Sequence, residues 1–206
     1  TIRLERDGGK WPVEASKDRI KFFQAMIRTG ELDWIDIGLE EIALMELHPE
    51  CLEHNTQILC SHHNFKQSYH AEELTALTQE IQLSGANAAK FALTFRDAGD
   101  AQELYRFLHE RTDHYVFAAF SMGDLGRESR LLAPLLGASG TYGYTGDTAA
   151  APGQITTQAM TQFFKSIHHH SYLEGVNMNR ELLSQHIQVL AQHFLQDLDS
   201  HTEDLT

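Results

Sequence analysis

Short apolar runs alternate along the chain with longer segments in which apolar residues recur at helical spacing. The runs are typical of strands buried in a sheet, and the periodic segments are typical of amphipathic helices. This pattern predicts strands over residues 1–5, 34–39, 57–61, 88–95, 115–120 and, weakly, 140–144. It predicts helices over residues 16–28, 44–52, 74–85, 101–108, 127–136, 156–168 and 183–194. Because the two alternate with short connections, we expect parallel strands joined by crossover helices, an α/β fold.

The first predicted strand leads into Asp7-Gly8-Gly9, and the glycine-rich phosphate loop of a doubly wound sheet is not found there. A (β/α)8 barrel of the TIM type is the better prediction, and in barrels the chemistry lies at the C-terminal ends of the strands. We expect the barrel to occupy residues 1–170 and a C-terminal helical extension to occupy residues 171–206. The residues at or near predicted strand ends include Arg3, His63, Lys90, Met122 and Gln154.

The charge balance narrows the classes of partner. The 206 residues include 16 Lys and Arg against 29 Asp and Glu, a formal net charge of −13, which argues against nucleic acid and anionic membranes. No apolar run approaches the ~20 residues of a membrane span, and no secretory leader is visible. Cys51 and Cys60 suggest no disulfide framework, so we expect a cytoplasmic protein. The histidines at 168–170 would point in different directions on a helix, so we expect no metal site.

Lys90 is the most informative single residue, because it interrupts the apolar strand predicted over residues 88–95. Burial disfavours the charged form of a lysine and lowers its pKa, which makes the amine a nucleophile near neutral pH. A neutral amine condenses with a ketone to an iminium, which accepts electrons from the neighbouring carbon. The alternative is a lysine at a strand end whose ammonium group reaches solvent.

Five short motifs occur in a fixed order along the chain. They are TIR with DGG at residues 1–9, SHHNF at 61–65, KFA at 90–92, SMGDLGRESR at 121–130 and APGQ at 151–154. Together they resemble type I 3-dehydroquinate dehydratase, the Schiff-base enzyme of the shikimate pathway of aromatic amino-acid biosynthesis. Each motif alone is weak, but all five in order are strongly specific.

The resemblance implies a barrel lyase that converts 3-dehydroquinate to 3-dehydroshikimate through a lysine iminium. Lys90 would form the Schiff base. His63 would remove the proton beside the iminium carbon and then protonate the leaving hydroxyl, which suits a group that titrates near neutral pH. Asp7 would orient His63. Because side chains alternate on an extended chain, only one of the adjacent histidines faces the site, and His62 is then a surface or packing residue.

The resemblance also implies a set of substrate contacts. Arg130 would bind the substrate carboxylate with its planar donor pair. Arg3 and Gln154 would hold ring hydroxyls, and Met122 and Tyr142 would form an apolar wall. It implies no cofactor and a homodimer. For two further residues we expect no role in the site: we interpret Arg127 as a solvated charge at a helix start and Cys60 as a core residue.

Three departures from the family pattern leave alternatives open. The Glu-x-Arg pair of the family's first strand has no counterpart in this sequence, which predicts a barrel incomplete at its N-terminus with an extra C-terminal helix. Ala150 stands where the family usually has a substrate-binding serine, and Asp7 is shorter than the usual glutamate. The alternative is a non-catalytic or regulatory relative that binds a quinate- or shikimate-type metabolite. A third possibility, another lysine-iminium barrel such as an aldolase, is disfavoured by His63 and the 152–154 loop.

Overall fold

The computed structural model of the chain describes residue 5 and residues 9–39, 43–174 and 180–203. Most of the predicted first strand, including Arg3, and the following Asp7 therefore lie outside the described residues. The strands are β1 (Trp34–Gly38), β2 (Gln57–His63), β3 (Ala88–Thr94) and β4 (Val116–Met122). The helices are η2 (Val13–Ala15), α1 (Ser16–Ile27), α2 (Ala43–Glu53), α3 (Ala71–Leu83), α4 (Ala98–Glu110), η3 (Asp124–Gly126), α5 (Arg127–Leu136), α6 (Thr157–Glu174) and α7 (Arg180–Glu203).

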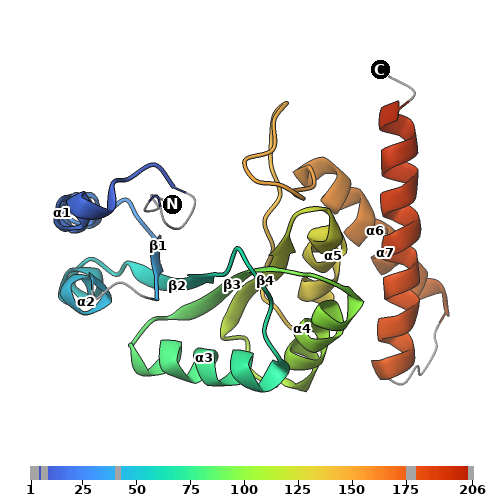
Figure 1. Cartoon of the computed structure of the whole chain (residues 1–206), viewed down its shortest axis with the longest axis horizontal. Coiled ribbons are helices and arrows are strands. Elements are labelled where there is room, and N and C mark those ends of the chain that lie inside the picture. The colour runs from blue at the N-terminus through green and yellow to red at the C-terminus, as the bar shows by residue number, and fades with distance from the viewer. Residues whose placement is uncertain (1–4, 6–8, 40–42, 175–179, 204–206) are drawn as a thin grey trace.

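The four strands form one parallel sheet in the order β1-β2-β3-β4 (Figure 1). Each strand is followed by a helix that returns the chain to the same end of the sheet, so sequence neighbours are also spatial neighbours. This is the arrangement that the alternation of strands and helices predicted. The C-terminal ends of all four strands consequently lie at one edge, where the predicted chemistry is expected.

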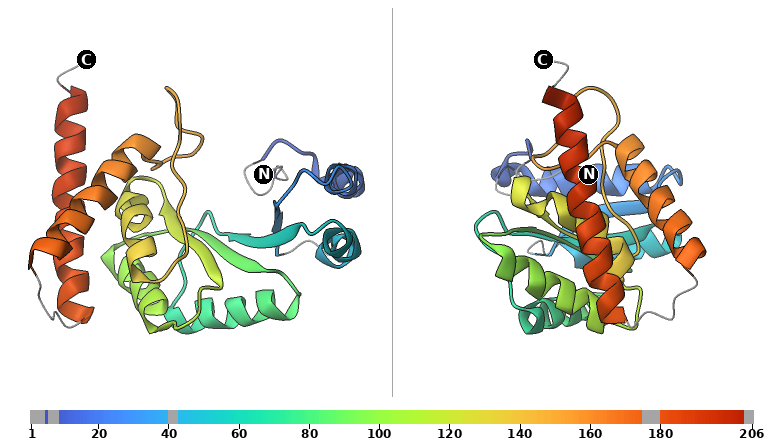
Figure 2. Two further views of the ribbon diagram at one scale, coloured as in Figure 1. Left: turned by 180° about the vertical axis from the view of Figure 1, so that it is seen from behind. Right: turned by 90° about the vertical axis from the view of Figure 1, so that its right-hand side faces the viewer.

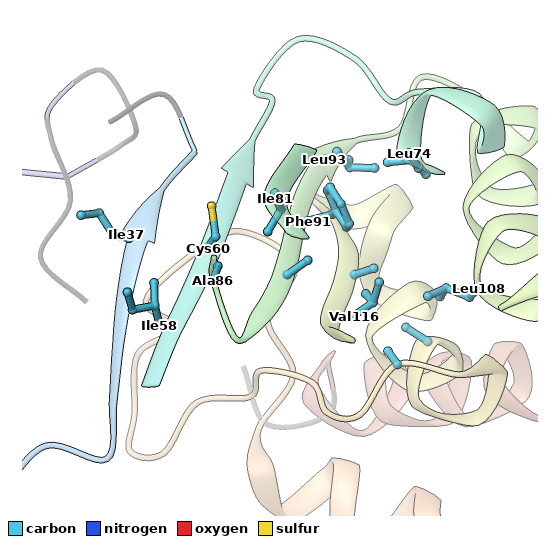
Figure 3. Close-up of a cluster of buried hydrophobic side chains, with 14 of the residues drawn as sticks. Ile37, Ile58, Cys60, Leu74, Ile81, Ala86, Phe91, Leu93, Leu108 and Val116 are labelled. Carbon is cyan, nitrogen blue, oxygen red and sulfur yellow. The ribbon is translucent and has the colours of Figure 1, made fainter. Parts of the chain in front are cut away.

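The two faces of the sheet differ in character because side chains alternate along each strand. One face carries apolar residues that pack against the helices, and Figure 3 shows them, including Ile37, Cys60 and Phe91 of the sheet with Leu74 and Ile81 of α3. Cys60 is fully buried there, as predicted. The opposite face carries the polar residues Asp36 of β1, Ser61 of β2 and Lys90 of β3.

The weak strand predicted over residues 140–144 is not formed. Backbone pairing with β4 stops after two bonds, from Ser139 N to the Val116 carbonyl at 3.0 Å and from Gly140 N to the Phe117 carbonyl at 2.7 Å. The chain then turns toward the start of α6, where Tyr144 forms an isolated bridge with Thr156. The segment is thus a bent connection that passes over the polar face of the sheet.

Helix α7 lies along α5 and α6, outside the sheet (Figures 1 and 2). Its Ala191 is fully buried against Leu132 and Phe163. Arg127 lies at the start of α5, as predicted, and donates to both carboxylate oxygens of Asp199 on α7, each at 2.8 Å, in an exposed ion pair that the sequence did not predict. None of the helices in the described part of the chain has the length and apolar character that crossing a bilayer requires.

We expect the α7 contact to contribute measurably to stability. The rings of Phe194 and Phe163 have centroids 5.3 Å apart, so Phe194→Ala should lower the free energy of unfolding by about 2–3 kcal/mol. Val189 on the same helix is 49% exposed, and Val189→Ala should cost less than about 1 kcal/mol. Urea unfolding followed by circular dichroism compares the two variants, and equal losses would contradict the packing role of α7.

Candidate active site

Lys90 lies in the middle of β3 on the polar face of the sheet. Its side chain is only 1% exposed, and its Nζ donates to Asp36 Oδ2 at 2.6 Å. The ammonium group also lies 4.7 Å from the centroid of the Tyr142 ring. The alternative of a solvent-exposed lysine at a strand end is therefore wrong, because the amine is enclosed by a carboxylate and an aromatic face.

Asp36 is a residue of the candidate site that the sequence analysis did not identify. Burial alone would raise its pKa, but attraction to Lys90 and hydrogen bonds from Lys90 and Ser61 outweigh that effect and hold the pKa of Asp36 below its usual value. The signal was present in the sequence, because an acid between Ile35 and Ile37 is as costly to bury as a lysine in a strand. Only the register of the sheet shows that the two charges meet, across 54 positions of sequence.

The Asp36–Lys90 pair predicts a pH-dependent stability. A carboxyl whose pKa is lower in the folded than in the unfolded protein stabilises the fold above its unfolded pKa, and this contribution is lost as the pH falls through the folded pKa. We expect Asp36→Asn to cost about 3 kcal/mol at pH 7, because it leaves a buried amine without its counter-ion. The difference in the free energy of unfolding between the wild type and the variant should shrink as the pH falls below about 4. Urea unfolding at pH 7 and pH 3 measures this difference, and a difference that does not change with pH would contradict this account.

His63 is the last residue of β2 and shares the polar face with Lys90. Ser61 is paired with Lys90 in the ladder and His63 with Ala92, two positions further along each strand. The imidazole also contributes to lowering the pKa of Asp36, so the three groups interact electrostatically. Its ring stacks on Phe65, with centroids 6.3 Å apart and planes inclined by 15°. The structure thus brings Lys90 and His63 together, whereas Asp7 lies outside the described residues.

Arg130 of α5 supplies a buried positive charge beside this face. Arg130 is 1% exposed to solvent, and its Cζ lies 4.1 Å from the centroid of the Phe120 ring. Nη1 donates to the Tyr142 carbonyl at a long 3.5 Å, and Nε has no hydrogen-bond partner among the described residues. Burial lowers the pKa of Arg130 to about 10. A buried guanidinium with unused donors is suited to binding an anion.

A family model described as type I 3-dehydroquinase matches residues 1–171. The chain belongs to this family. Membership confirms the predicted family and enzyme class, and it removes the aldolase alternative.

Relatives and solved structures support the assignment. The chain is 28% identical over 171 residues to the 3-dehydroquinate dehydratase of Enterococcus faecalis, covering 81% of this chain and 67% of the relative. It is 30% identical over 173 residues to that of Clostridium kluyveri, covering 81% and 67%. The crystal structure of the 3-dehydroquinate dehydratase from Geobacillus kaustophilus superposes with a TM-score of 0.75 at 26% identity, covering 82% of this chain and 67% of the other. This likeness confirms the predicted TIM-type fold class.

An aromatic cluster borders the candidate site. The Tyr142 ring contacts the rings of Phe117 and Phe120, with both centroid distances 6.0 Å. Met122, at the end of β4, packs against the same cluster. The predicted wall residues Met122 and Tyr142 therefore lie together, and the two phenylalanines are an addition that only the fold reveals.

Gln154 is engaged with its own loop. Its Oε1 accepts hydrogen bonds from the backbone N–H groups of Ala150 at 2.8 Å and Ala151 at 3.2 Å. The adjacent Gly153 has φ +73°, and a Cβ there would stand 2.2 Å from the Gly123 carbonyl oxygen at the end of β4. The loop is thus seated against the C-terminal edge of the sheet, and the contact of Gln154 with a ring hydroxyl stays a prediction. No group of metal-ligating side chains occurs among the residues described, while the side chains of 168–170 lie outside them.

Proposed function

We propose that the chain dehydrates 3-dehydroquinate to 3-dehydroshikimate through a Schiff base on Lys90. The observation that carries this proposal is the enclosed amine of Lys90, which is held by Asp36 on the sheet face that also bears His63. Membership of the type I 3-dehydroquinase family supports the reaction, and the substrate is a small anionic metabolite that suits Arg130.

The first half of the reaction would form the iminium. Lys90 must give up one proton before its lone pair attacks the substrate ketone, and the neighbouring Asp36 carboxylate is placed to accept it. Addition gives a carbinolamine, and loss of water then leaves the iminium. Asp36 would return its proton to the carbinolamine hydroxyl, which leaves as water, and would become a carboxylate again. The iminium is a cation where the ammonium was, so the regenerated Asp36 carboxylate would be its counter-ion and stabilise it in a buried site.

The second half would move one proton. His63 would take the proton from the carbon beside the iminium, and the electron pair would shift into the iminium to give an enamine. The enamine would expel the hydroxyl as water, with the proton supplied by the imidazolium of His63. Water would finally hydrolyse the conjugated iminium, releasing 3-dehydroshikimate and the free amine of Lys90.

Arg130 would hold the substrate carboxylate during these steps. Its partly unused donors beside the Phe120 ring suit a planar anion, and this contact would orient the reacting carbon toward His63. The aromatic cluster around Tyr142 would exclude water from the opposite side, which strengthens the charged contacts. The homodimer, the cytoplasmic location and the biosynthetic pathway remain predictions from the sequence.

A second candidate is a metabolite-binding relative without turnover. The observation that favours it is Ala150, which offers no hydroxyl and whose N–H is used by Gln154. Such a protein would bind 3-dehydroquinate reversibly and would not need the amine of Lys90 to react.

Chemical trapping separates the two candidates. The protein is incubated with 3-dehydroquinate, reduced with borohydride and digested, and the adduct is located by mass spectrometry. We expect an adduct on Lys90 in the wild type and in His63→Ala, with slow turnover in the latter. Binding of 3-dehydroquinate by the wild type without any trapped adduct would overturn the proposal and favour the binding protein.

A further inference from the structure

A single phenol connects the two residues on either side of His63. Tyr69 Oη lies 3.0 Å from His62 Nε2 and 2.8 Å from Asn64 Nδ2. A hydroxyl donates one hydrogen bond and accepts up to two, so it satisfies both neighbours at once. The rings of His62 and Tyr69 are also in contact, with centroids 5.5 Å apart.

These contacts lie on the side of the sheet opposite to the catalytic groups. His62 is paired with Phe91 in the ladder, and Phe91 belongs to the apolar core beneath the helices. Tyr69 packs against the same core. Because side chains alternate, anchoring His62 on this face directs His63 to the other one.

Asn64 is held at its backbone as well as its side chain. Its N–H donates to the Ala92 carbonyl at 2.9 Å, and its own carbonyl accepts from Thr94 Oγ1 at 2.9 Å. Its Oδ1 accepts from the N–H groups of Lys66 at 2.9 Å and Gln67 at 3.2 Å. Asn64 therefore ties the end of β2 to β3 and also shapes the loop that carries Tyr69.

The position of His63 makes such anchoring necessary. It is the last residue of β2, where ladder pairing ends. A group that transfers a proton must stay within hydrogen-bond reach of the reacting carbon, and a displacement of about 1 Å can cost about 10²-fold in rate.

We propose that Tyr69 is a positioning residue for His63: its hydroxyl holds His62 and Asn64 and thereby fixes the backbone on both sides of the imidazole. The expected effect of Tyr69 on catalysis rests on the proposed function. Its expected effect on the position of the His63 ring does not rest on that function and is tested in the protein without substrate.

The test compares two tyrosines that each lose only a hydroxyl. Tyr69→Phe removes both hydrogen bonds beside His63. Tyr115→Phe is the matched control, since Tyr115 Oη donates to the Ala86 carbonyl at 2.8 Å at the opposite end of β3. For 3-dehydroquinate we expect Tyr69→Phe to lower kcat about tenfold with KM within about twofold, and the Lys90 adduct to be trapped as in the wild type. Tyr115→Phe should keep both constants within about twofold.

Nuclear magnetic resonance of the protein without substrate tests the positioning directly. The ring protons of His63, assigned with His63→Ala, should shift in Tyr69→Phe because the stacking on Phe65 changes, and they should stay unchanged in Tyr115→Phe. Unchanged His63 signals in Tyr69→Phe, or equal losses of kcat in the two variants, would overturn the proposal. A wild type that neither traps nor converts 3-dehydroquinate would overturn the proposed function instead, while the resonance comparison would still decide the role of Tyr69.

Discussion

Replacing Lys90 by methionine is expected to abolish the borohydride-trapped adduct and to lower kcat/KM for 3-dehydroquinate by about 10⁴-fold or more. Methionine has nearly the shape of the lysine stem but no amine, so no iminium can form. Without the iminium, the proton beside the ketone is too weakly acidic for His63 to remove. Product formation followed by absorbance, together with mass spectrometry after reduction, measures both effects.

The same substitution is expected to destabilise the fold, and this must be separated from the loss of chemistry. Lys90→Met leaves Asp36 buried without its counter-ion, which should cost about 3–5 kcal/mol. The double variant Asp36→Asn/Lys90→Met carries neither charge and should recover much of that loss while remaining inactive. A double variant that regained activity, or a Lys90→Met protein that still trapped substrate, would refute the assigned role of Lys90.

Replacing Arg130 by methionine is expected to lower kcat/KM by about 10²–10³-fold, mainly through a higher KM. A charge-assisted, two-pronged contact with a carboxylate would be lost, and such a contact contributes about 2–4 kcal/mol in a buried site. Stability should be unchanged or increased, because the substitution removes a charge whose burial lowers its pKa to about 10. Initial rates over a range of substrate concentrations and urea unfolding provide the two measurements.

A matched control lies on the same helix. Arg127→Met breaks the surface ion pair with Asp199, which should lower stability slightly and leave kcat/KM within about twofold. Arg130→Lys keeps the charge but loses the planar pair of donors, so its activity should lie between the wild type and Arg130→Met. If Arg127→Met and Arg130→Met lost activity equally, Arg130 would have no specific part in binding the substrate.

The sequence by itself determined the α/β alternation, the buried strand around Lys90 and the family. These follow from local properties, because apolar periodicity reflects which face of each element is buried and a short motif keeps its residue types wherever it folds. Local geometry also required that only one of the adjacent histidines face the site, since neighbouring side chains on a strand point to opposite faces, and the family motif assigned that position to His63.

The tertiary structure alone decided which distant groups meet. Asp36 and Lys90 come together because β1, β2 and β3 are aligned in a particular register, and no local pattern specifies register. Arg127 finds Asp199 only because α7 folds back along α5. Tyr69 reaches His62 and Asn64 because the loop after β2 turns back onto the core. Contacts of this kind depend on how whole elements pack, so their chemistry becomes visible only once the chain is folded.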